Sequence, residues 1–380
     1  MNATILVITR NLPPLTGGME RLTQQLIETL ATRYRVVVIG PPGCAPFLPA
    51  NVEVHACRGS GAAAFLIEAA LRTLWLCARR SWLATVIATS GLSAPLAWLA
   101  ARLQGRDYLV IVHGLDLVTP HALYRHLFLP TIRAARTVVA NSANSAGLAR
   151  AVGVSASRID IVHPGVEWPT QLPSPQAFRE RHALGQRPLL LAVGRLVARK
   201  GLPEFVSLAL PAIVRAVPDL LLVVIGDEPR QAIRREQAVL PRLRAAIDEH
   251  RLQHHVMLRG HADDAEVREA CVAAQVFVFP LIPIAGDVEG FGMVAAEAAA
   301  CGLRSVAFEQ GGVSDALVPG ISGTLVAGGD YAALVQAIVE ELQNSNADVR
   351  RLACREAAHA FAWTHYRERM LAVLARHLDD

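Results

Sequence analysis

Short apolar runs rich in β-branched residues alternate with helix-length amphipathic segments along the whole chain, and each run is a predicted strand. In the first half of the chain these strands are Thr4–Thr9, Arg35–Gly40, Ala84–Thr89, Tyr108–Val112, Thr137–Ala140 and Ile159–Val162. In the second half they are Leu189–Val193, Leu220–Ile225, Val256–Arg259, Val276–Pro280 and Ser305–Phe308. Strands that alternate with helices are typical of βαβ units and parallel sheets. The pattern therefore predicts an α/β fold with two doubly wound domains.

A stretch without a periodic pattern separates the two halves. It begins at His163-Pro164-Gly165 and continues through a proline-rich segment from Trp168 to Pro175, which is typical of a domain linker. We predict an N-terminal domain over residues 1–168, a second domain over residues 169–356 and a C-terminal helix over residues 357–380. The residues leave open whether that helix packs back on the first domain.

The composition is that of a folded globular protein. Of the 380 residues, 52% are hydrophobic and 18% are charged, which excludes a disordered or fibrous chain. The longest uncharged run lies between Arg80 and Arg102 and is long enough to cross a bilayer. Because Thr89, Gly91 and Pro95 interrupt it, we predict a strand, a loop and a helix instead. No basic segment precedes the first apolar run, so we predict no signal peptide and a cytoplasmic protein.

Positive charge is concentrated in the first half of the chain. Residues 1–168 hold 15 Arg against 8 acidic residues, a net charge of +7, whereas the remainder holds 22 basic against 25 acidic residues, a net charge of −3. A basic lobe favours an anionic partner. The chain has no recognisable nucleic-acid motif, so we expect no nucleic acid partner and favour a membrane surface or an anionic substrate.

Two segments of the first half combine basic and aromatic side chains: Leu74–Trp82 and Tyr124–Phe128. Such a mixture on a helix favours an anionic membrane surface. An ordinary helix with a solvated basic face explains the two segments equally well. Peripheral association with the inner face of the membrane is therefore one expectation.

Lys200 is the only lysine among the 37 basic residues. It lies in the segment Gly194–Gly201, directly after the predicted strand Leu189–Val193 and at the start of a helix. This order puts Arg195 and Lys200 at the carboxyl edge of the sheet, where α/β proteins bind ligands. Two cations beside a helix N-terminus suit a diphosphate. Two competing explanations remain. The single lysine could have survived by chance, and the segment could be a solvated basic loop that binds no ligand.

Gly17 and Gly18 form a turn between the first predicted strand and an amphipathic helix. Glycines allow backbone N–H groups to approach an anion at a helix start, although a glycine pair is more often only a turn. The chain lacks a G-x-G-x-x-G spacing at this point, which counts against a nicotinamide-dependent oxidoreductase.

The segment from Glu289 to Glu297 carries two carboxylates eight residues apart, and Gly290 and Gly292 bracket Phe291 within it. A helix that begins near Phe291 would leave Glu289 in the preceding loop and place Glu297 two turns inside. The two carboxylates would then grip different parts of one ligand. The N–H groups of Gly292, Met293 and Val294 would face a phosphate between them.

These segments, taken in order, resemble the retaining glycosyltransferases of family 4, which have the two-domain architecture called GT-B. The resemblance covers most of the chain. It rests on Gly17-Gly18, His113-Gly114, Asn141-Ser142, His163 to Val166, Arg195 to Gly201, Gly226, Glu289 to Glu297 and Gly311-Gly312. One departure is the stretch from Ile282 to Val288, which is a longer approach to Glu289 than many members have.

The resemblance implies two Rossmann-like domains that face a central cleft, with the acceptor on the first and the nucleotide sugar on the second. It implies that Arg195 and Lys200 hold the donor diphosphate, Glu289 a sugar hydroxyl and Glu297 the ribose. His113 would lie near the donor sugar. Apart from the resemblance, we predict that Asp116 orients the ring, as a carboxylate can orient an imidazole. The implied catalytic residues are His113, Glu289, Arg195 and Lys200. The implied donor-binding residues are Gly17, Gly18, Gly226, Gly290, Phe291, Gly292, Met293, Val294 and Glu297.

The function that the resemblance implies is transfer of a hexose from a UDP- or GDP-hexose to a hydroxyl group with retention of configuration. We expect a glycan or glycolipid acceptor in cell-surface polysaccharide or lipopolysaccharide synthesis. We expect no cofactor and no metal, since no Asp-x-Asp motif occurs and two cations can replace a divalent ion. The alternatives are a non-catalytic two-lobed sugar- or nucleotide-binding protein and another GT-B enzyme, such as a sugar-nucleotide epimerase or an α-glucan phosphorylase.

Overall fold

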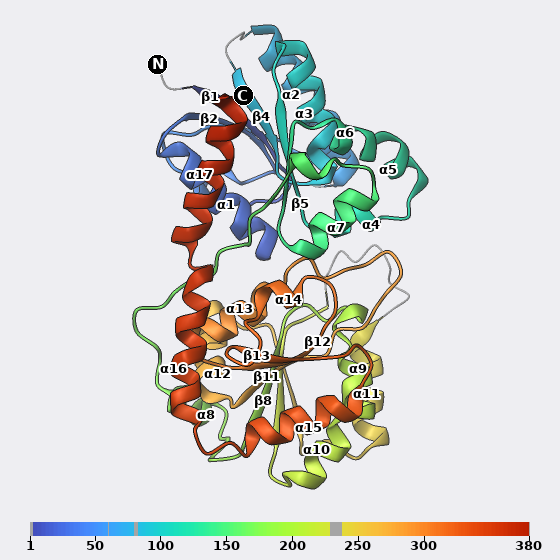
Figure 1. Cartoon of the computed structure of the whole chain (residues 1–380), viewed down its shortest axis with the longest axis vertical. Coiled ribbons are helices and arrows are strands. Elements are labelled where there is room, and N and C mark those ends of the chain that lie inside the picture. Colours follow the sequence, from blue (N-terminus) through green and yellow to red (C-terminus); the bar gives the residue numbers. More distant parts are fainter. Residues whose placement is uncertain (1–2, 60, 80–82, 229–237, 380) are drawn as a thin grey trace. The chain divides into compact units, whose positions relative to one another are not determined.

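The computed structural model describes residues 3–59, 61–79, 83–228 and 238–379. The chain forms two compact units (Figure 1). The first consists of Met1–Gly165 together with Trp363–Asp380, and the second of Val166–Ala362. The predicted domains end at residues 168 and 356, whereas the chain passes between the two units after Gly165 and again after Ala362.

The first unit contains a parallel sheet of seven strands in the order β3-β2-β1-β4-β5-β6-β7. The strands are β1 (Thr4–Ile8), β2 (Arg35–Gly40), β3 (Glu53–Ala56), β4 (Leu83–Ala88), β5 (Tyr108–Val112), β6 (Thr137–Ala140) and β7 (Ile159–Ile161). Strand order reverses between β1 and β4, which both lie in the middle of the sheet. In doubly wound sheets ligands bind beside such a reversal, at the carboxyl ends of the strands.

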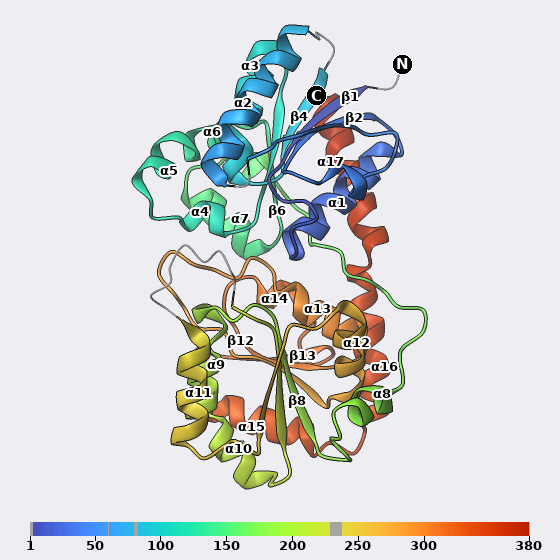
Figure 2. The same ribbon diagram turned by 180° about the vertical axis from the view of Figure 1, so that it is seen from behind.

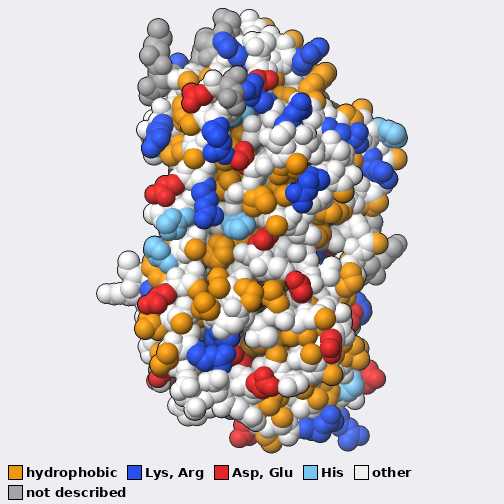
Figure 3. Space-filling model, in the orientation of Figure 1, with side chains coloured by type: hydrophobic (Ala, Val, Ile, Leu, Met, Phe, Trp, Pro, Cys, Tyr) orange, Lys and Arg blue, Asp and Glu red, His pale blue; other side chains and the backbone are white. Residues whose placement is uncertain are grey.

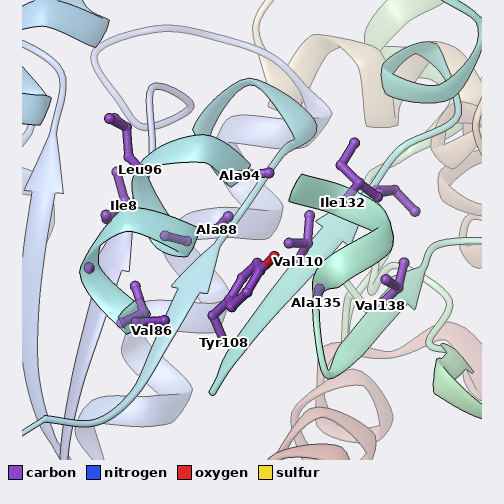
Figure 4. Packing of buried hydrophobic residues seen from close by; sticks show 14 of the residues in the cluster. Ile8, Val86, Ala88, Ala94, Leu96, Tyr108, Val110, Ile132, Ala135 and Val138 are labelled. Atoms are coloured by element: carbon purple, nitrogen blue, oxygen red, sulfur yellow. The ribbon is translucent and has the colours of Figure 1, made fainter. Parts of the chain in front are cut away.

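Alternate side chains of these strands enter two separate apolar layers. Leu6 and Ile8 pack toward α2 (Ala62–Arg79) and α3 (Ala94–Gln104), and Figure 4 shows part of this layer. The neighbouring side chains of β1 pack toward α1 (Gly18–Ala31) and α17 (Trp363–Asp379) on the opposite face. The period of two along a strand thus produces a three-layer unit. The shorter helices of this unit are α4 (Leu115–Val118), α5 (Ala122–Leu127), α6 (Leu129–Ala134) and α7 (Ala143–Ala151).

The second unit contains a parallel sheet of six strands in the order β10-β9-β8-β11-β12-β13. The strands are β8 (Leu189–Val193), β9 (Leu221–Ile225), β10 (Val256–Gly260), β11 (Val276–Phe279), β12 (Ser305–Phe308) and β13 (Gly323–Val326). One face packs against α9 (Leu202–Leu208), α10 (Leu210–Ala216), α11 (Val239–Glu249) and α15 (Tyr331–Leu342). The other face packs against α8 (Pro175–Arg181), α12 (Asp264–Ala273) and α13 (Met293–Ala300) (Figure 2). The prediction of two doubly wound α/β domains is confirmed.

The uncharged run before Arg102 folds as the sequence predicts. It contains β4, a 3-10 turn over Gly91–Ser93, and α3. Among the described residues we find no helix that combines the length and the apolar composition required to cross a bilayer.

The C-terminal stretch is not the single helix that its pattern predicts. α16 (Ala347–Ala358) ends in a 3-10 turn, Ala362 is extended, and α17 begins at Trp363. The linker contacts the segment between α16 and α17. Val166 donates its N–H to the carbonyl of Phe361 at 2.7 Å and forms a β-bridge with Ala362. As a result α16 belongs to the second unit and α17 to the first.

His377 fastens α17 to the first sheet through both ring nitrogens. Nε2 lies 2.8 Å from Oγ1 of Thr85 and Nδ1 lies 2.8 Å from Oγ1 of Thr137. The Thr85 hydroxyl donates to the carbonyl of Asp107, so its oxygen accepts from Nε2–H. Burial lowers the pKa of His377 to about 4, so the ring is neutral at pH 7 and Nδ1 accepts from the Thr137 hydroxyl.

We expect this histidine to make the first unit sensitive to mild acid. Unfolding restores an ordinary pKa near 6.5, so the unfolded chain binds more protons and stability falls as pH decreases from 6.5 to 4. The loss should reach about 3 kcal/mol. His377→Gln should flatten this dependence in urea unfolding curves, whereas the exposed His254→Gln should not. An unchanged slope in His377→Gln would contradict the assignment.

Candidate active site

Two loops of the second unit meet at the carboxyl ends of β8 and β11. The first follows β8 and carries Arg199 and Lys200, and the second follows β11 and carries Glu289. Ile282 donates its N–H to the carbonyl of Arg199 at 2.9 Å. Gly201 has φ +62°, and a Cβ at this position would clash with the carbonyl oxygen of Pro280. These backbone contacts fix the register of the two loops.

Lys200 points into the protein. It is the last residue of a 3-10 turn and only 8% exposed. Its Nζ donates to Oε2 of Glu289 at 2.9 Å and lies 4.3 Å from the ring centroid of Phe279. Burial lowers the pKa of Lys200; Glu289 opposes that shift, and the guanidinium groups of Arg199 and Arg195 add to it. Removal of the ammonium group from water is therefore the main reason that the pKa of Lys200 falls, and the Glu289 carboxylate offsets it only in part.

Glu289 accepts two charged hydrogen bonds on one oxygen. Its Oε2 lies 2.9 Å from Nζ of Lys200 and 3.2 Å from Nε of Arg199. Burial would raise the pKa of Glu289, but the two cations outweigh it and hold this pKa at about 2. The carboxylate is thus ionised at neutral pH. Among the described residues we see no hydrogen bond to Oε1, which leaves that oxygen able to accept from a ligand hydroxyl.

Two glycine contacts hold the backbone around this site. Gly312 donates its N–H to the carbonyl of Glu289 at 2.9 Å, and a Cβ on Gly312 would clash with the carbonyl oxygen of Gly290. At the ends of β8 and β9, a Cβ on Gly226 would clash with the carbonyl oxygen of Gly194. Both positions bring backbone segments closer than any side chain would permit.

The helix after Glu289 begins two residues later than the sequence suggested. Gly292 adopts a left-handed conformation and is the N-cap, and α13 starts at Met293. Glu297 therefore lies about one turn inside the helix, not two. Phe291 is 2% exposed and packs edge to face on Phe361, so only its backbone can reach a ligand. The first N–H groups of α13, at Met293 and Val294, have no acceptor within the helix.

Arg195 lies beside Lys200 but is exposed. It lines one small pocket together with Lys200 and Phe279. The structure thus brings together the two predicted cations and Glu289. The sequence reasoning missed Arg199 and Asp287, which form an ion pair at 3.1 Å beside this pocket. The sequence indicates a role for them only through their positions: Arg199 is next to Lys200, and Asp287 lies two residues before Glu289.

His113 occupies the carboxyl end of β5 in the first unit and is 8% exposed. Its Nε2 lies 2.9 Å from the carbonyl oxygen of Thr89. Since a carbonyl only accepts, Nε2 carries a proton and donates it to Thr89, and in the neutral ring Nδ1 is the acceptor. Asp116 accepts from the backbone N–H of His113 at 3.0 Å. The expectation that Asp116 orients the ring is wrong; the carbonyl of Thr89 does so.

The Gly17-Gly18 turn already faces a carboxylate. Gly17 is the N-cap of α1 and Gly18 its first residue. Oε1 of Glu20 accepts from Asn11 at 3.0 Å, and a Cβ on Gly17 would lie 2.5 Å from Oε2 of Glu20. A carboxylate at a helix start is favourable. An anion that binds at this turn would have to displace it.

Two family models together match most of the chain. The model described as glycosyl transferases group 1 matches residues 175–360, and the model described as glycosyltransferase family 4 matches residues 16–167. The first match lies within the second unit, and the other covers most of the N-terminal part of the first unit; neither includes α17.

Curated relatives are mannosyl- and glycosyltransferases. The GDP-mannose-dependent alpha-(1-6)-phosphatidylinositol monomannoside mannosyltransferase of Mycolicibacterium smegmatis is 32% identical over 285 residues, which are 70% of this chain and 69% of that protein. The enzyme of the same name from Mycobacterium tuberculosis is 32% identical over 66% of this chain and 65% of its own length. The D-inositol 3-phosphate glycosyltransferase of Mycobacterium ulcerans is 30% identical over 59% of this chain. The chain spans only 46% of that last relative.

Solved structures extend the likeness over nearly the whole chain. Anabaena Alr3699/HepE in complex with UDP and glucose has a TM-score of 0.79 at 18% identity and covers 98% of this chain and 100% of its own. Sucrose-phosphate synthase from Thermosynechococcus elongatus has a TM-score of 0.80 at 21% identity, with 98% of each chain covered. These likenesses show the GT-B fold. With the family matches and the mycobacterial relatives, they establish that the chain belongs to glycosyltransferase family 4, the group 1 glycosyl transferases.

Proposed function

We propose that the protein transfers a hexose from a nucleoside diphosphate sugar to a hydroxyl group of a lipid-linked acceptor, with retention of configuration and without a metal ion. The observation that carries this proposal is the buried ammonium of Lys200, which two guanidinium groups crowd and whose pKa burial lowers. A diphosphate would supply the missing negative charge. Such fixed charges stabilise a leaving group in a site that excludes water.

Six residues of the second unit have a defined role in this proposal. Lys200 and Arg195 bind the diphosphate, and the N–H groups of Met293 and Val294 bind it from the start of α13. Oε1 of Glu289 accepts from a sugar hydroxyl. Glu297 accepts from the ribose.

The low pKa of Glu289 supports a mechanism without a protein nucleophile. A carboxylate with a pKa of about 2 is a weak base, and its Oε2 is already bound to two cations. In the proposed step the bond between the anomeric carbon and the phosphate oxygen breaks, and the acceptor oxygen bonds to that carbon on the same face. The acceptor proton passes to the departing phosphate. For His113 we keep the role that the family resemblance implies, a position near the donor sugar.

A lipid acceptor is supported by the exposed apolar side of α2. Ile67 is 66% exposed and Leu71 62%, and Leu74 and Trp75 are each 44% exposed. Their spacing of three and four residues places them along one side of the helix. The guanidinium of Arg79 lies 4.6 Å from the Trp75 ring. Arg80, Ser81 and Trp82, which belong to the same predicted segment, lie outside the described residues.

The second predicted membrane segment, Tyr124–Phe128, exposes little aromatic surface for contact with lipid. Tyr124 and Phe128 stack on each other at 4.7 Å and are only partly exposed. The exposed apolar residues of α5 are Leu123 and Leu127 instead. Basic side chains are spread over the face of the first unit, the upper unit in Figure 3. We therefore assign membrane contact to α2 and not to Tyr124 or Phe128.

We expect the protein to bind anionic phosphatidylglycerol vesicles at low salt. Replacement of Ile67 and Leu71 by serine should weaken this binding at least about tenfold, since each buried aliphatic side chain contributes about 1.5 kcal/mol or more. Flotation at 50 and 300 mM salt measures the effect. Leu208→Ser, at an exposed leucine of the second unit, is the matched control. Equal binding by the double variant would remove the support for a membrane role.

The experiment that tests the proposed function is a donor panel in the presence of EDTA. UDP-, GDP-, ADP- and dTDP-hexoses are offered with phosphatidylinositol mannosides or with a lipid-linked oligosaccharide, since the relatives include GDP-mannose-dependent enzymes. Release of the nucleoside diphosphate and an NMR spectrum with retained anomeric configuration are the expected results. Loss of turnover with EDTA contradicts metal independence. Thermal stabilisation without turnover favours a binding protein, and conversion of the donor without release of diphosphate favours an epimerase.

A further inference from the structure

Arg199 connects two acidic residues of the opposite loop. Its Nη1 lies 3.2 Å and 3.1 Å from the two carboxylate oxygens of Asp287, and its Nε lies 3.2 Å from Oε2 of Glu289. The side chain is 14% exposed. One planar guanidinium thus holds two carboxylates with separate nitrogens, a geometry that an ammonium cannot reproduce.

Binding of a diphosphate would affect the contacts of Lys200 and Arg199 with Glu289 differently. In the present structure both donate to the same oxygen of Glu289. A diphosphate that attracts Lys200 draws its Nζ away from Glu289. Arg199 has no such conflict, because Asp287 anchors its other nitrogen and the backbone of Arg199 is bound to Ile282. Glu289 therefore keeps a cation when Lys200 turns to the donor.

We propose that Arg199, anchored by Asp287, is a positioning residue that keeps Glu289 ionised and aimed at the donor sugar while Lys200 binds the diphosphate. This inference rests on the proposed function. It gives a purpose to the long approach to Glu289, because Asp287 lies within that stretch. Arg199 touches neither the donor nor the reacting atoms in this scheme.

The charged groups around Glu289 determine its pKa, so the inference can be tested through the pH dependence of the reaction. Lys200 and Arg199 face it from the loop after β8, and Asp287 lies in its own loop. The loop after β12 contacts its backbone through Gly311 and Gly312, which carry no charge. Loss of Arg199 removes one of two cations that lower the pKa of Glu289, so this pKa must rise.

The test is a kinetic comparison of Arg199→Gln, Arg199→Lys and Asp287→Asn over pH 4 to 8, with the sugar donor that the panel identifies. Arg199→Gln should lower kcat roughly 10- to 100-fold, the range found when a partner of a site residue is lost. The donor KM should change less than about threefold, because the diphosphate contacts remain. The acid limb of the kcat profile should move to higher pH. Asp287→Asn should show the same shift with a smaller loss, and Arg199→Lys should restore neither quantity fully.

Arg242→Gln is the matched control, since Arg242 pairs with Glu204 at the surface of the same unit, and it should leave the profile unchanged. A wild-type acid limb in both Arg199→Gln and Asp287→Asn overturns the inference. If Arg199→Gln does not fold, Asp287→Asn decides alone. Absence of turnover in the wild type overturns the proposed function itself, which is a separate outcome.

Discussion

Replacement of Lys200 by alanine should lower kcat/KM for the sugar donor by about 10³-fold, the upper range for loss of one charge-stabilising group. It should also abolish the rise in melting temperature that nucleoside diphosphates cause, because a ligand stabilises only the state that binds it. The physical reason is that Lys200 is the buried cation of the site, whereas Arg195 is exposed. Steady-state kinetics and a thermal-shift series measure the two effects.

Lys200→Arg should rescue little of this activity. The Lys200 side chain is packed between the Phe279 ring and Glu289, where a larger planar group does not fit. In the wild type, donor affinity should weaken on the alkaline side below pH 10.5, since the pKa of Lys200 is lowered and only the ammonium form pairs with a diphosphate. A donor affinity unchanged in Lys200→Ala would refute the assignment of the diphosphate site.

Glu289→Gln should lower kcat by about 10²- to 10³-fold, because the amide has no charge and reorients its acceptor oxygen toward the cations. It should also destabilise the second unit at neutral pH, by about 3 kcal/mol if the two cations are left uncompensated. The carboxylate stabilises the folded state fully above its ordinary pKa of 4.5, and this contribution is lost as pH falls toward 2. The free energy of unfolding of the variant, measured with urea, should therefore change less between pH 4.5 and 2 than that of the wild type.

Glu204→Gln serves as the control for this prediction, since Glu204 pairs with the half-exposed Arg242. An exposed ion pair contributes at most about 1 kcal/mol, so this control should lie near the wild type in both measurements. A Glu289→Gln variant with full activity would show that Oε1 does not contact the sugar.

The central strands were predictable because burial on both faces leaves an uninterrupted apolar run. β2, β5, β6, β8 and β12 match their predicted ranges. The two strands that the sequence missed, β3 and β13, both lie at a sheet edge. Glu53 and His55 of β3 are partly exposed, so half of that strand has no need of apolar side chains. Its short polar sequence carries no strand signal.

The sequence singles out Lys200 and Glu289 but not the pairing between them. Lys200 and Glu289 stand out as an isolated lysine and a glycine-flanked acid, yet 89 residues separate them and only the fold brings Nζ to Oε2. Arg199 and Asp287 look like any surface charges in the sequence. The partner of His113 is a backbone carbonyl, that of Thr89, which every residue type possesses. No side-chain pattern can identify such a partner.

The return of α17 to the first unit has a consequence for protein synthesis. Residues 166–362 make up the whole second unit and are translated before residue 363, whereas the face of β1 that carries Ile5 and Val7 lacks the cover of Tyr366 and Met370 until α17 has been made. Exposed apolar surface in a nascent chain invites aggregation. The first unit is thus completed only after the second has been translated, and a stop codon between the two would leave the first unit without α17.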